Sequence, residues 1–287
     1  MVERYAKDYD DDLTSASFSA LIELSTALRS YRDSLVLIGG WVPFLLVQEH
    51  GCPDPDFRHV GSIDIDLAVD PDTVDYNGYA NIVEIIRHRG YSPRLDALGD
   101  PIWFSFSKDI ISQVNARDYT IQVDFLTSAG TLSKKKHRHR LVQSDLHARI
   151  AECCEIAFSH KMRKGVEGIL PGDGRTELDI DMLDIPGCIG MKGVVLGERY
   201  KEKDAYDILT VVGKCGRGPE DNARMVSPFL REPCMKRGMD IIRTKFKDIG
   251  SDGPSWYARF LTLDPEEGKR RMAEAYATMK RFLEALL

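Results

Sequence analysis

Two aspartates stand inside the apolar stretch HVGSIDIDLAVD, which runs from residue 59 to residue 70. The stretch is typical of a strand, on which side chains two residues apart share a face, so Asp64 and Asp66 should point the same way. Asp124 lies in a second apolar strand, YTIQVDFLTS. Converging carboxylates repel one another unless a cation binds them, and Mg²⁺ prefers oxygen ligands. We expect the three aspartates to hold Mg²⁺ or Mn²⁺; solvated edge-strand residues or loop caps are the alternatives.

A glycine pair, Gly39 and Gly40, lies between the predicted strand SLVLI and the predicted helix WVPFLLVQEH. Backbone N–H groups at such a junction can bind an anion, and glycine lets a phosphate approach closely. One predicted helix separates the pair from Asp64, which favours a position at the same end of neighbouring strands. A simple tight turn is the alternative interpretation.

Cationic residues recur along the stretch from Ile189 to Val212, which predicts one long helix. At 100° per residue, Lys192, Arg199 and Lys203 fall on one stripe, and apolar residues gather on the opposite side. We expect this stripe, with Asp207 beside it, to lie at the surface and to offset charge on a triphosphate. A solvated stripe without a ligand is the alternative.

The sharpest charge run is KKKHRHR, from Lys134 to Arg140. It follows the predicted strand of Asp124 closely, so it could contact the phosphates of a polynucleotide acceptor. A solvated loop is the alternative. His59, His137 and His139 are given no metal role, because a hard cation prefers oxygen.

The elements that must position these residues alternate between helices and strands over the first 130 residues or so. The order predicts a small α/β unit within residues 1–145, and a mostly helical domain is expected in residues 146–287. Helices are expected at residues 14–33, 146–162 and 265–287, and a strand at 177–183.

Composition excludes several classes of protein. The net charge of −6 over 287 residues argues against a protein that coats nucleic acid by bulk charge. No apolar run approaches the roughly 20 residues needed to cross a bilayer. The N-terminal sequence MVERYAKDYDDDL is polar and acidic, unlike a signal peptide. These features predict a cytoplasmic protein with no membrane partner.

The combination LIGGWVPFLL…RHVGSIDIDLAVD resembles the nucleotidyltransferase superfamily that includes DNA polymerase β. Within it, the chain looks most like the AbiEii-type toxins of bacterial toxin–antitoxin systems. Those proteins carry a Ser or Thr two positions before the first Asp, matched by Ser62. They also carry a later helix with a Lys and an Arg-x-x-x-Lys-Asp-x-x-Asp run. That helix is matched by Lys192, Arg199, Lys203, Asp204 and Asp207. The resemblance covers roughly residues 30–212. It implies an α+β fold, with a mixed sheet flanked by helices and a mostly helical C-terminal domain that contributes a Lys/Arg helix to the site.

This resemblance implies an enzyme that transfers a nucleotide from an NTP to a hydroxyl, with the 3′ end of tRNA as the first candidate acceptor and an antitoxin protein as a possible partner. Asp124 could also help to take the proton of the acceptor hydroxyl. A small-molecule or protein acceptor, and an inactive fold that binds a nucleotide or a partner, remain alternatives. The implied catalytic residues are Asp64, Asp66, Asp124 and Lys192, and the implied nucleotide contacts are Gly39, Gly40, Ser62, Lys192, Arg199, Lys203 and Asp207.

Overall fold

The computed structural model describes residues 5–74, 81–112, 117–130, 138–172 and 174–286. The chain divides into two compact units, which we call the sheet unit and the helical unit. The predicted boundary near residue 145 does not coincide with this division, because later strands return to the sheet. The sheet unit comprises Asp10–Trp41 and Ser62–Met182, and the helical unit comprises Met1–Tyr9, Val42–Gly61 and Leu183–Leu287.

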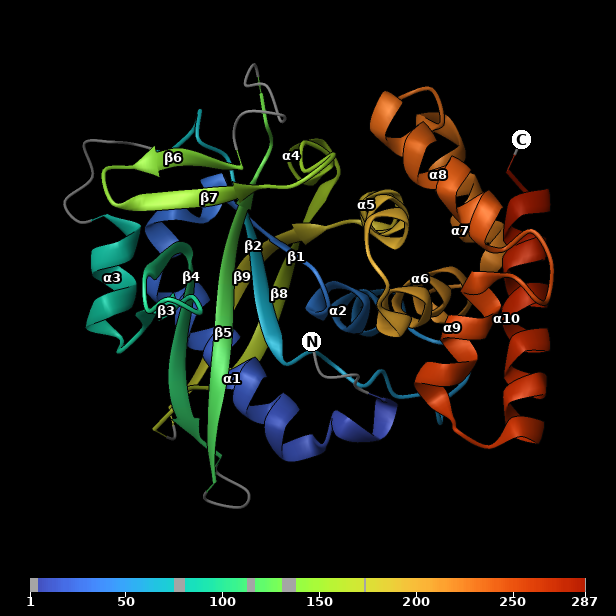
Figure 1. The fold of residues 1–287 in the computed structure, drawn as a ribbon, viewed down its shortest axis with the longest axis horizontal. Helices are drawn as coiled ribbons and strands as arrows, with labels where there is room; N and C mark the ends of the chain where they lie inside the picture. The colour runs from blue at the N-terminus through green and yellow to red at the C-terminus, as the bar shows by residue number, and fades with distance from the viewer. Residues whose placement is uncertain (1–4, 75–80, 113–116, 131–137, 173, 287) are drawn as a thin grey trace. The chain divides into compact units, whose positions relative to one another are not determined.

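The sheet unit is built on a mixed sheet with the strand order β3-β4-β5-β2-β1-β9-β8, and the hairpin β6–β7 adds to β5 (Figure 1). β2 is parallel to β5 and antiparallel to β1. This mixed sheet with surrounding helices fits the α+β prediction. The strands are β1 (Leu35–Ile38), β2 (Asp64–Val69), β3 (Ser92–Leu95), β4 (Pro101–Ile111), β5 (Asp118–Thr127), β6 (His139–Gln143), β7 (Leu146–Ile150), β8 (Lys161–Ile169) and β9 (Arg175–Leu183).

One face of the sheet is apolar and lies against α1 (Asp11–Ala27). Alternation along β2 and β5 directs Ile65 and Val123 to this face, where both are fully buried. The other helical segments of this unit are η2 (Arg29–Ser34), α3 (Ile82–His88) and the short α4 (Ile156–Ser159). The same alternation leaves the aspartates of β2 and β5 on the opposite face.

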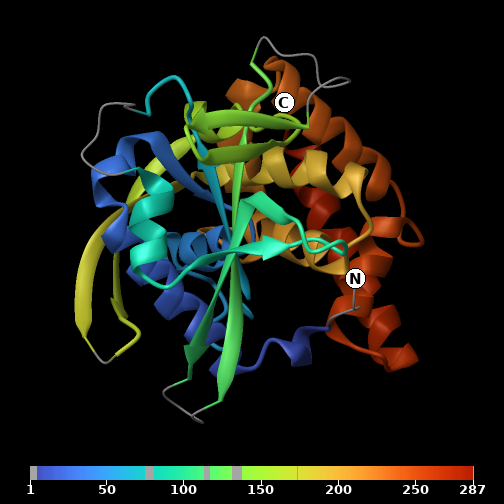
Figure 2. The ribbon, with the colours of Figure 1, turned by 60° about the vertical axis from the view of Figure 1, so that its left-hand side comes forward.

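The outer strands β8 and β9 form a long, bent hairpin, yellow in Figure 2. Gly168 of β8 lies so close to α1 that a Cβ at this position would stand 2.5 Å from Ile22. The edge of the sheet therefore also packs on α1.

The predicted helix at residues 146–162 is wrong. Residues 146–150 form β7, which pairs with β5 and β6, and only Ile156–Ser159 is helical before β8 begins. Leu146 and Ala148 are buried while Arg149 is exposed. Pairing with neighbouring strands, which the sequence alone does not reveal, overrides the local helical spacing here.

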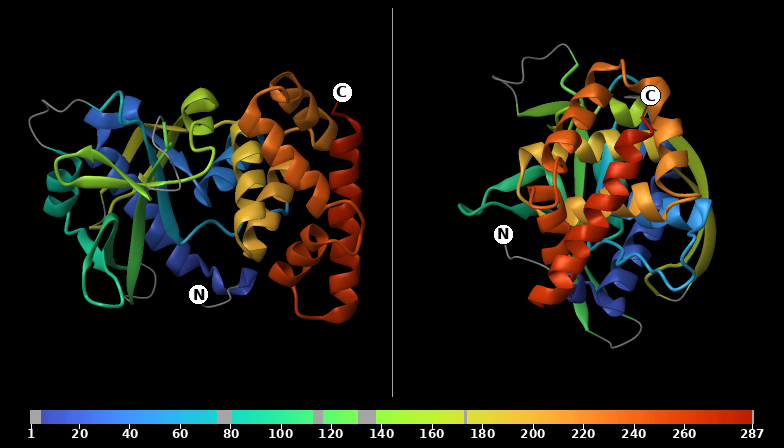
Figure 3. Two further views of the ribbon diagram at one scale, coloured as in Figure 1. Left: turned by 45° about the horizontal axis from the view of Figure 1, so that its top comes forward. Right: turned by 90° about the vertical axis from the view of Figure 1, so that its right-hand side faces the viewer.

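The helical unit is packed around α5, α6 and α8. Gly193 of α5 and Gly238 of α8 allow these helices to cross closely, since a Cβ on Gly238 would stand 2.2 Å from the Gly190 carbonyl oxygen. The last helix, red in Figure 3, packs against α6, α7 and α9. The helical segments are η1 (Ala6–Asp8), α2 (Trp41–His50), α5 (Ile185–Glu198), α6 (Glu202–Lys214), α7 (Pro219–Val226), η3 (Ser227–Phe229), α8 (Pro233–Lys245), α9 (Asp252–Leu261) and α10 (Pro265–Glu284).

The single long helix predicted over residues 189–212 is also wrong. α5 ends at Glu198 and α6 begins at Glu202, and the backbone of Arg199 and Lys201 between them is extended. The helix expected at residues 265–287 is confirmed as α10, with an end at Glu284. Among the helices of the described residues, none has the length and apolarity to cross a membrane.

Candidate functional site

The three predicted carboxylates share one face of the sheet. Asp66 of β2 is the register partner of Asp124 on β5, and Asp64 is the partner of Gln122. Neighbouring strands lie about 4.8 Å apart, so Asp66 and Asp124 are adjacent side chains. The prediction that these aspartates converge is confirmed; their roles stay a prediction.

Asp124 is held by two neutral donors. The Ser105 hydroxyl of β4 donates to Asp124 Oδ1 at 2.5 Å, and Gln122 Nε2 donates to the same oxygen at 2.8 Å. The Arg94 guanidinium in turn donates to Ser105 Oγ at 3.3 Å. Ser105 is buried, so its hydroxyl has a fixed environment. Both hydrogen bonds end on Oδ1, so they fix the orientation of the carboxylate. Neither of these two donors bonds to Oδ2.

The glycine turn lies directly against Asp66. Ile38 at the end of β1 pairs with Asp66, and Gly39 follows with a φ of +77°. A Cβ on Gly39 would stand 2.2 Å from Asp66 Oδ2. Only glycine accommodates both this φ and this close approach. The predicted strand–Gly-Gly–helix junction is thus confirmed, with Gly40 immediately before α2.

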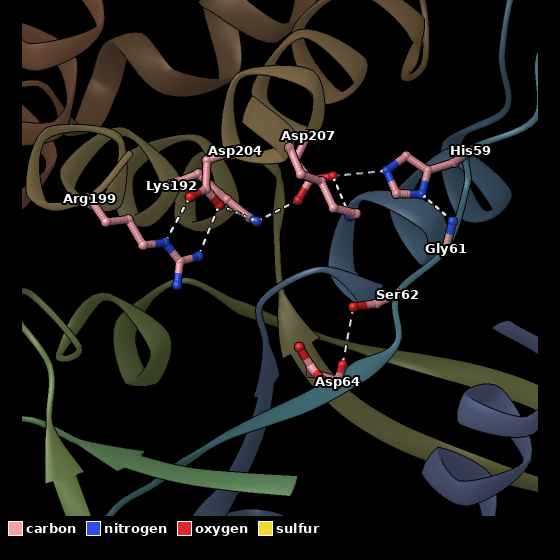
Figure 4. A network of polar contacts seen from close by, with 9 residues as sticks. His59, Gly61, Ser62, Asp64, Lys192, Arg199, Asp204 and Asp207 are labelled. Carbon is pink, nitrogen blue, oxygen red and sulfur yellow. Dashed lines mark hydrogen bonds and ion pairs between the residues drawn. The ribbon is translucent and has the colours of Figure 1, made fainter. Parts of the chain in front are cut away.

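These residues fit a hard divalent cation. The donor atoms are carboxylate oxygens, which such cations prefer, and Gly39 leaves the space beside Asp66 free of a side chain. Asp64, Asp66 and Asp124 are all partly accessible to solvent. Ser62 lies just before this strand, where its hydroxyl donates to the Asp64 backbone carbonyl at 3.1 Å (Figure 4). Its predicted contact with a nucleotide stays a prediction.

The remaining predicted residues form a second group, which we call the ion-pair cluster, inside the helical unit. Asp207 is fully buried and accepts hydrogen bonds from Lys192 Nζ at 2.5 Å and Lys203 Nζ at 2.8 Å. Asp204 accepts from Lys192 at 3.2 Å and from two nitrogens of Arg199 at 2.9 and 3.1 Å. Lys192 therefore bridges both aspartates (Figure 4).

His59 contacts the cluster from the segment after α2. Its Nδ1 accepts the Gly61 N–H at 3.0 Å, so the ring proton resides on Nε2, which donates to Asp207 at 3.1 Å. Burial lowers the pKa of His59 to about 4, and the nearby Asp207 carboxylate only partly offsets this effect. The imidazole is therefore neutral at pH 7 and acts as a hydrogen-bond donor.

The charges of the cluster stabilise one another. Burial by itself would lower the pKa of Lys192, but Asp207 and Asp204 outweigh burial and raise it. Burial by itself would raise the pKa of Asp207, yet Lys192 and Lys203 hold this pKa well below its usual range. With three cations, two aspartates and a neutral His59, the cluster carries one excess positive charge. The side chain of Arg199 is 44% exposed and is its most accessible cation.

The predicted surface stripe of cations is wrong. Lys192 and Lys203 are only 7% and 4% exposed. The break between α5 and α6 resets the helical phase, so the projection at 100° per residue does not extend from one lysine to the other. Both lysines point inward, to aspartates on α6.

The predicted charge run from Lys134 to Arg140 is described only in part. Residues 134–137 lie outside the described residues, whereas Arg138, His139 and Arg140 are described.

The sequence analysis did not identify Ser105 and Gln122 as partners of Asp124. The position of Gln122 could be predicted, because it lies two residues from Asp124 and so shares its face. The contact of Ser105 with Asp124 could not be predicted, because the register of β4 against β5 cannot be read from the sequence.

Comparison with known proteins gives distant structural similarity. No protein-family model matches the chain, and no curated protein matches its sequence. An antigenic nucleotidyltransferase-like protein from Paracoccidioides brasiliensis is similar in structure, with 11% identity, a TM-score of 0.45, and coverage of 87% of this chain and 96% of that one. JHP933 from Helicobacter pylori has 12% identity, a TM-score of 0.40, and coverage of 96% and 95%. Both TM-scores are below 0.5, so the functional argument rests on this chain's own residues.

Proposed function

We propose that the chain is a metal-dependent nucleotidyltransferase that moves a nucleotide from an NTP to an acceptor hydroxyl. The observation that carries the proposal is the side-by-side placement of Asp66 and Asp124, with Asp64 on the same face and the Gly39 backbone against Asp66. Carboxylate oxygens gathered on one face are the ligands that a hard divalent cation prefers.

In this proposal Asp64, Asp66 and Asp124 hold Mg²⁺ or Mn²⁺. When bound, such ions would neutralise negative charge on the triphosphate, on the attacking oxygen of the acceptor and on the leaving phosphate oxygen. Asp124 is suited to a second task, because Ser105 and Gln122 fix its Oδ1 and orient the carboxylate toward an acceptor hydroxyl, whose proton it would take. The backbone of Gly39 and Gly40 would approach the triphosphate closely.

The predicted nucleotide contacts of Ser62 and Arg199 remain part of the proposal, whereas Lys192, Lys203 and Asp207 are paired with one another inside the helical unit. The excess positive charge of the ion-pair cluster supports binding of an anion, and Arg199 is the exposed end of that charge. Lys192 and Lys203 are engaged with aspartates, so their main effect is expected on the stability of the helical unit.

The acceptor and the biological role extend the proposal further. An RNA acceptor, with the 3′ end of tRNA as the first candidate, and a toxin paired with an antitoxin protein are supported by the sequence resemblance to AbiEii-type proteins. A small molecule, another protein and an inactive binding fold are the competing possibilities.

The experiment is incubation of the purified protein and Mg²⁺ or Mn²⁺ with each α-labelled NTP and three classes of acceptor: total tRNA, small hydroxyl compounds and protein. We expect labelling of one class, and a loss of at least about a hundredfold in Asp66→Asn and Asp124→Asn. Asp118→Asn is the matched control, because Asp118 is an exposed carboxylate on the same strand as Asp124. Full activity of the Asp66 and Asp124 variants, or no labelling of any acceptor, would contradict the proposal.

A further inference from the structure

The hairpin β6–β7 pairs with β5 beyond the point where the pairing of β4 with β5 ends. β4 pairs with β5 as far as Ser105, which lies opposite Asp124. Beyond this point β5 pairs with β7, with Leu126 as the partner of Arg149. Across the hairpin, Arg149 is the partner of His139 on β6. The hairpin therefore begins next to the candidate site.

This register fixes which side chains share a face with the aspartates. Leu126 is two residues beyond Asp124 on β5, so both point to the same side, and paired residues on neighbouring strands share a face. Arg149 and His139 therefore lie on the carboxylate face, about 7 Å along β5 from Asp124. We call the face formed by His139, Leu141, His147 and Arg149 the hairpin face.

The hairpin face combines cations with a supported aromatic ring. Arg138, His139 and Arg149 are exposed, whereas Val142 and Ala148 of the same hairpin are buried. The His139 ring is stacked on the Phe104 ring, with centroids 4.8 Å apart and an angle of 28° between planes. In the part of the chain that the structure describes, neither arginine pairs with a carboxylate.

The state of His139 suits stacking. Burial lowers the pKa of His139 first, and the charges of His147, Arg138 and Arg149 lower it further. The lowered pKa favours the neutral form of the ring. A neutral ring offers a flat surface to a nucleobase, and Arg149 can contact an adjoining phosphate.

We propose that the hairpin face binds a single-stranded nucleic acid and holds its end beside the aspartates; the delivery of that end rests on the proposed function. A base stacks on the exposed side of His139, which extends the stack that Phe104 begins. Arg149 contacts a backbone phosphate. An intact duplex fits poorly, because its bases are already stacked on one another.

Binding is tested by fluorescence anisotropy with a labelled 12-nucleotide RNA, in EDTA and without NTP, across a series of salt concentrations. Arg149→Ser should weaken binding and lower the log–log salt slope by about 0.7, the value for one lost phosphate contact on a single strand. His139→Ala should weaken binding by about 5- to 100-fold with the slope unchanged, since it removes stacking rather than charge.

Arg175→Ser is the matched control, because Arg175 is an exposed arginine on β9 and its loss changes the net charge by the same amount. It should bind RNA like the wild type, and thermal melts should show that every variant is folded. Equal effects of Arg149→Ser and Arg175→Ser would overturn the proposal in favour of bulk charge. Equal competition by duplex RNA or by an acidic polypeptide would also overturn it.

The same assay separates this proposal from the proposed function. Asp124→Asn should bind RNA as the wild type does while it loses nucleotide transfer. If the wild type binds RNA through the hairpin face but labels no acceptor, the proposed transfer reaction is contradicted and the proposed RNA-binding site is supported. If it transfers nucleotides and Arg149→Ser and His139→Ala bind RNA normally, the hairpin face is not the acceptor site.

Discussion

The aspartates of the sheet and those of the ion-pair cluster have different surroundings. In the ion-pair cluster, Asp204 and Asp207 are buried and receive lysine and arginine side chains at hydrogen-bonding distance. On the sheet, Asp124 is partly accessible and receives the neutral donors Ser105 and Gln122. Internal cations satisfy the first cluster, whereas neutral donors orient the carboxylate of the second without neutralising it.

The difference shows how one residue type serves two purposes. A buried carboxylate that is fully paired contributes to folding, and it is costly to remove because its partners are left buried and charged. A carboxylate that is oriented but not neutralised retains its affinity for a cation, and its removal has little effect on folding. Loss of stability and loss of binding should therefore separate cleanly between the two clusters.

The largest expected effect on folding is in the ion-pair cluster. Asp207→Ala leaves Lys192 and Lys203 buried without their shared partner, so the free energy of unfolding should fall by about 3–5 kcal/mol. Urea titration followed by circular dichroism measures this change. Asp240→Ala is the control, because Asp240 forms an exposed pair with Arg243 on α8, and its loss should cost less than about 1 kcal/mol. Similar losses of unfolding free energy in Asp207→Ala and Asp240→Ala would show that the buried cluster contributes no more to stability than an exposed pair.

A smaller effect should appear in the pH dependence of stability. The pKa of His59 is about 4 in the folded protein and 6.5 when it is unperturbed, so between these values the unfolded chain binds a proton that the folded chain does not. Stability should thus fall as pH decreases through this window, by about 2 kcal/mol at pH 5 and by about 3 kcal/mol below pH 4.

The variant His59→Gln keeps an N–H donor toward Asp207 but removes the titrating ring. Its free energy of unfolding should change less than that of the wild type between pH 7.5 and pH 5, by about 2 kcal/mol. Urea titrations at the two pH values measure the difference. An identical pH dependence in both proteins would show that His59 does not titrate in this window.

Sequence reasoning predicted the carboxylate cluster better than the ion-pair cluster, for a physical reason. Alternation within a strand is a local property, so Asp64 and Asp66 could be placed on one face, and the apolar context of Asp124 indicated a neighbouring strand. The burial of Lys192 and Lys203 depends on the break at residues 199–201. A helix that continued across that break would place both lysines on one exposed stripe, whereas with the break both lysines bind Asp207 inside the helical unit.

Contacts between strands that are distant in the sequence could not be predicted. The bond from Ser105 to Asp124 and the pairing of Arg149 with Leu126 both depend on strand register. Register is set by packing between segments distant in sequence, so neither contact could be derived from residue types. The same limitation explains why residues 146–150 were expected in a helix although they form β7.

The most direct test of the central claim is the effect of Mn²⁺ on thermal unfolding, with no nucleotide or acceptor present. At a concentration of about 100 times its Kd, Mn²⁺ should stabilise the wild type by about 2.7 kcal/mol and raise its Tm by about 5 °C. Asp66→Asn should show no increase in Tm with Mn²⁺, whereas Asp118→Asn should respond like the wild type. An equal increase in all three proteins, or none in the wild type, would contradict the claim that the sheet aspartates form a metal site.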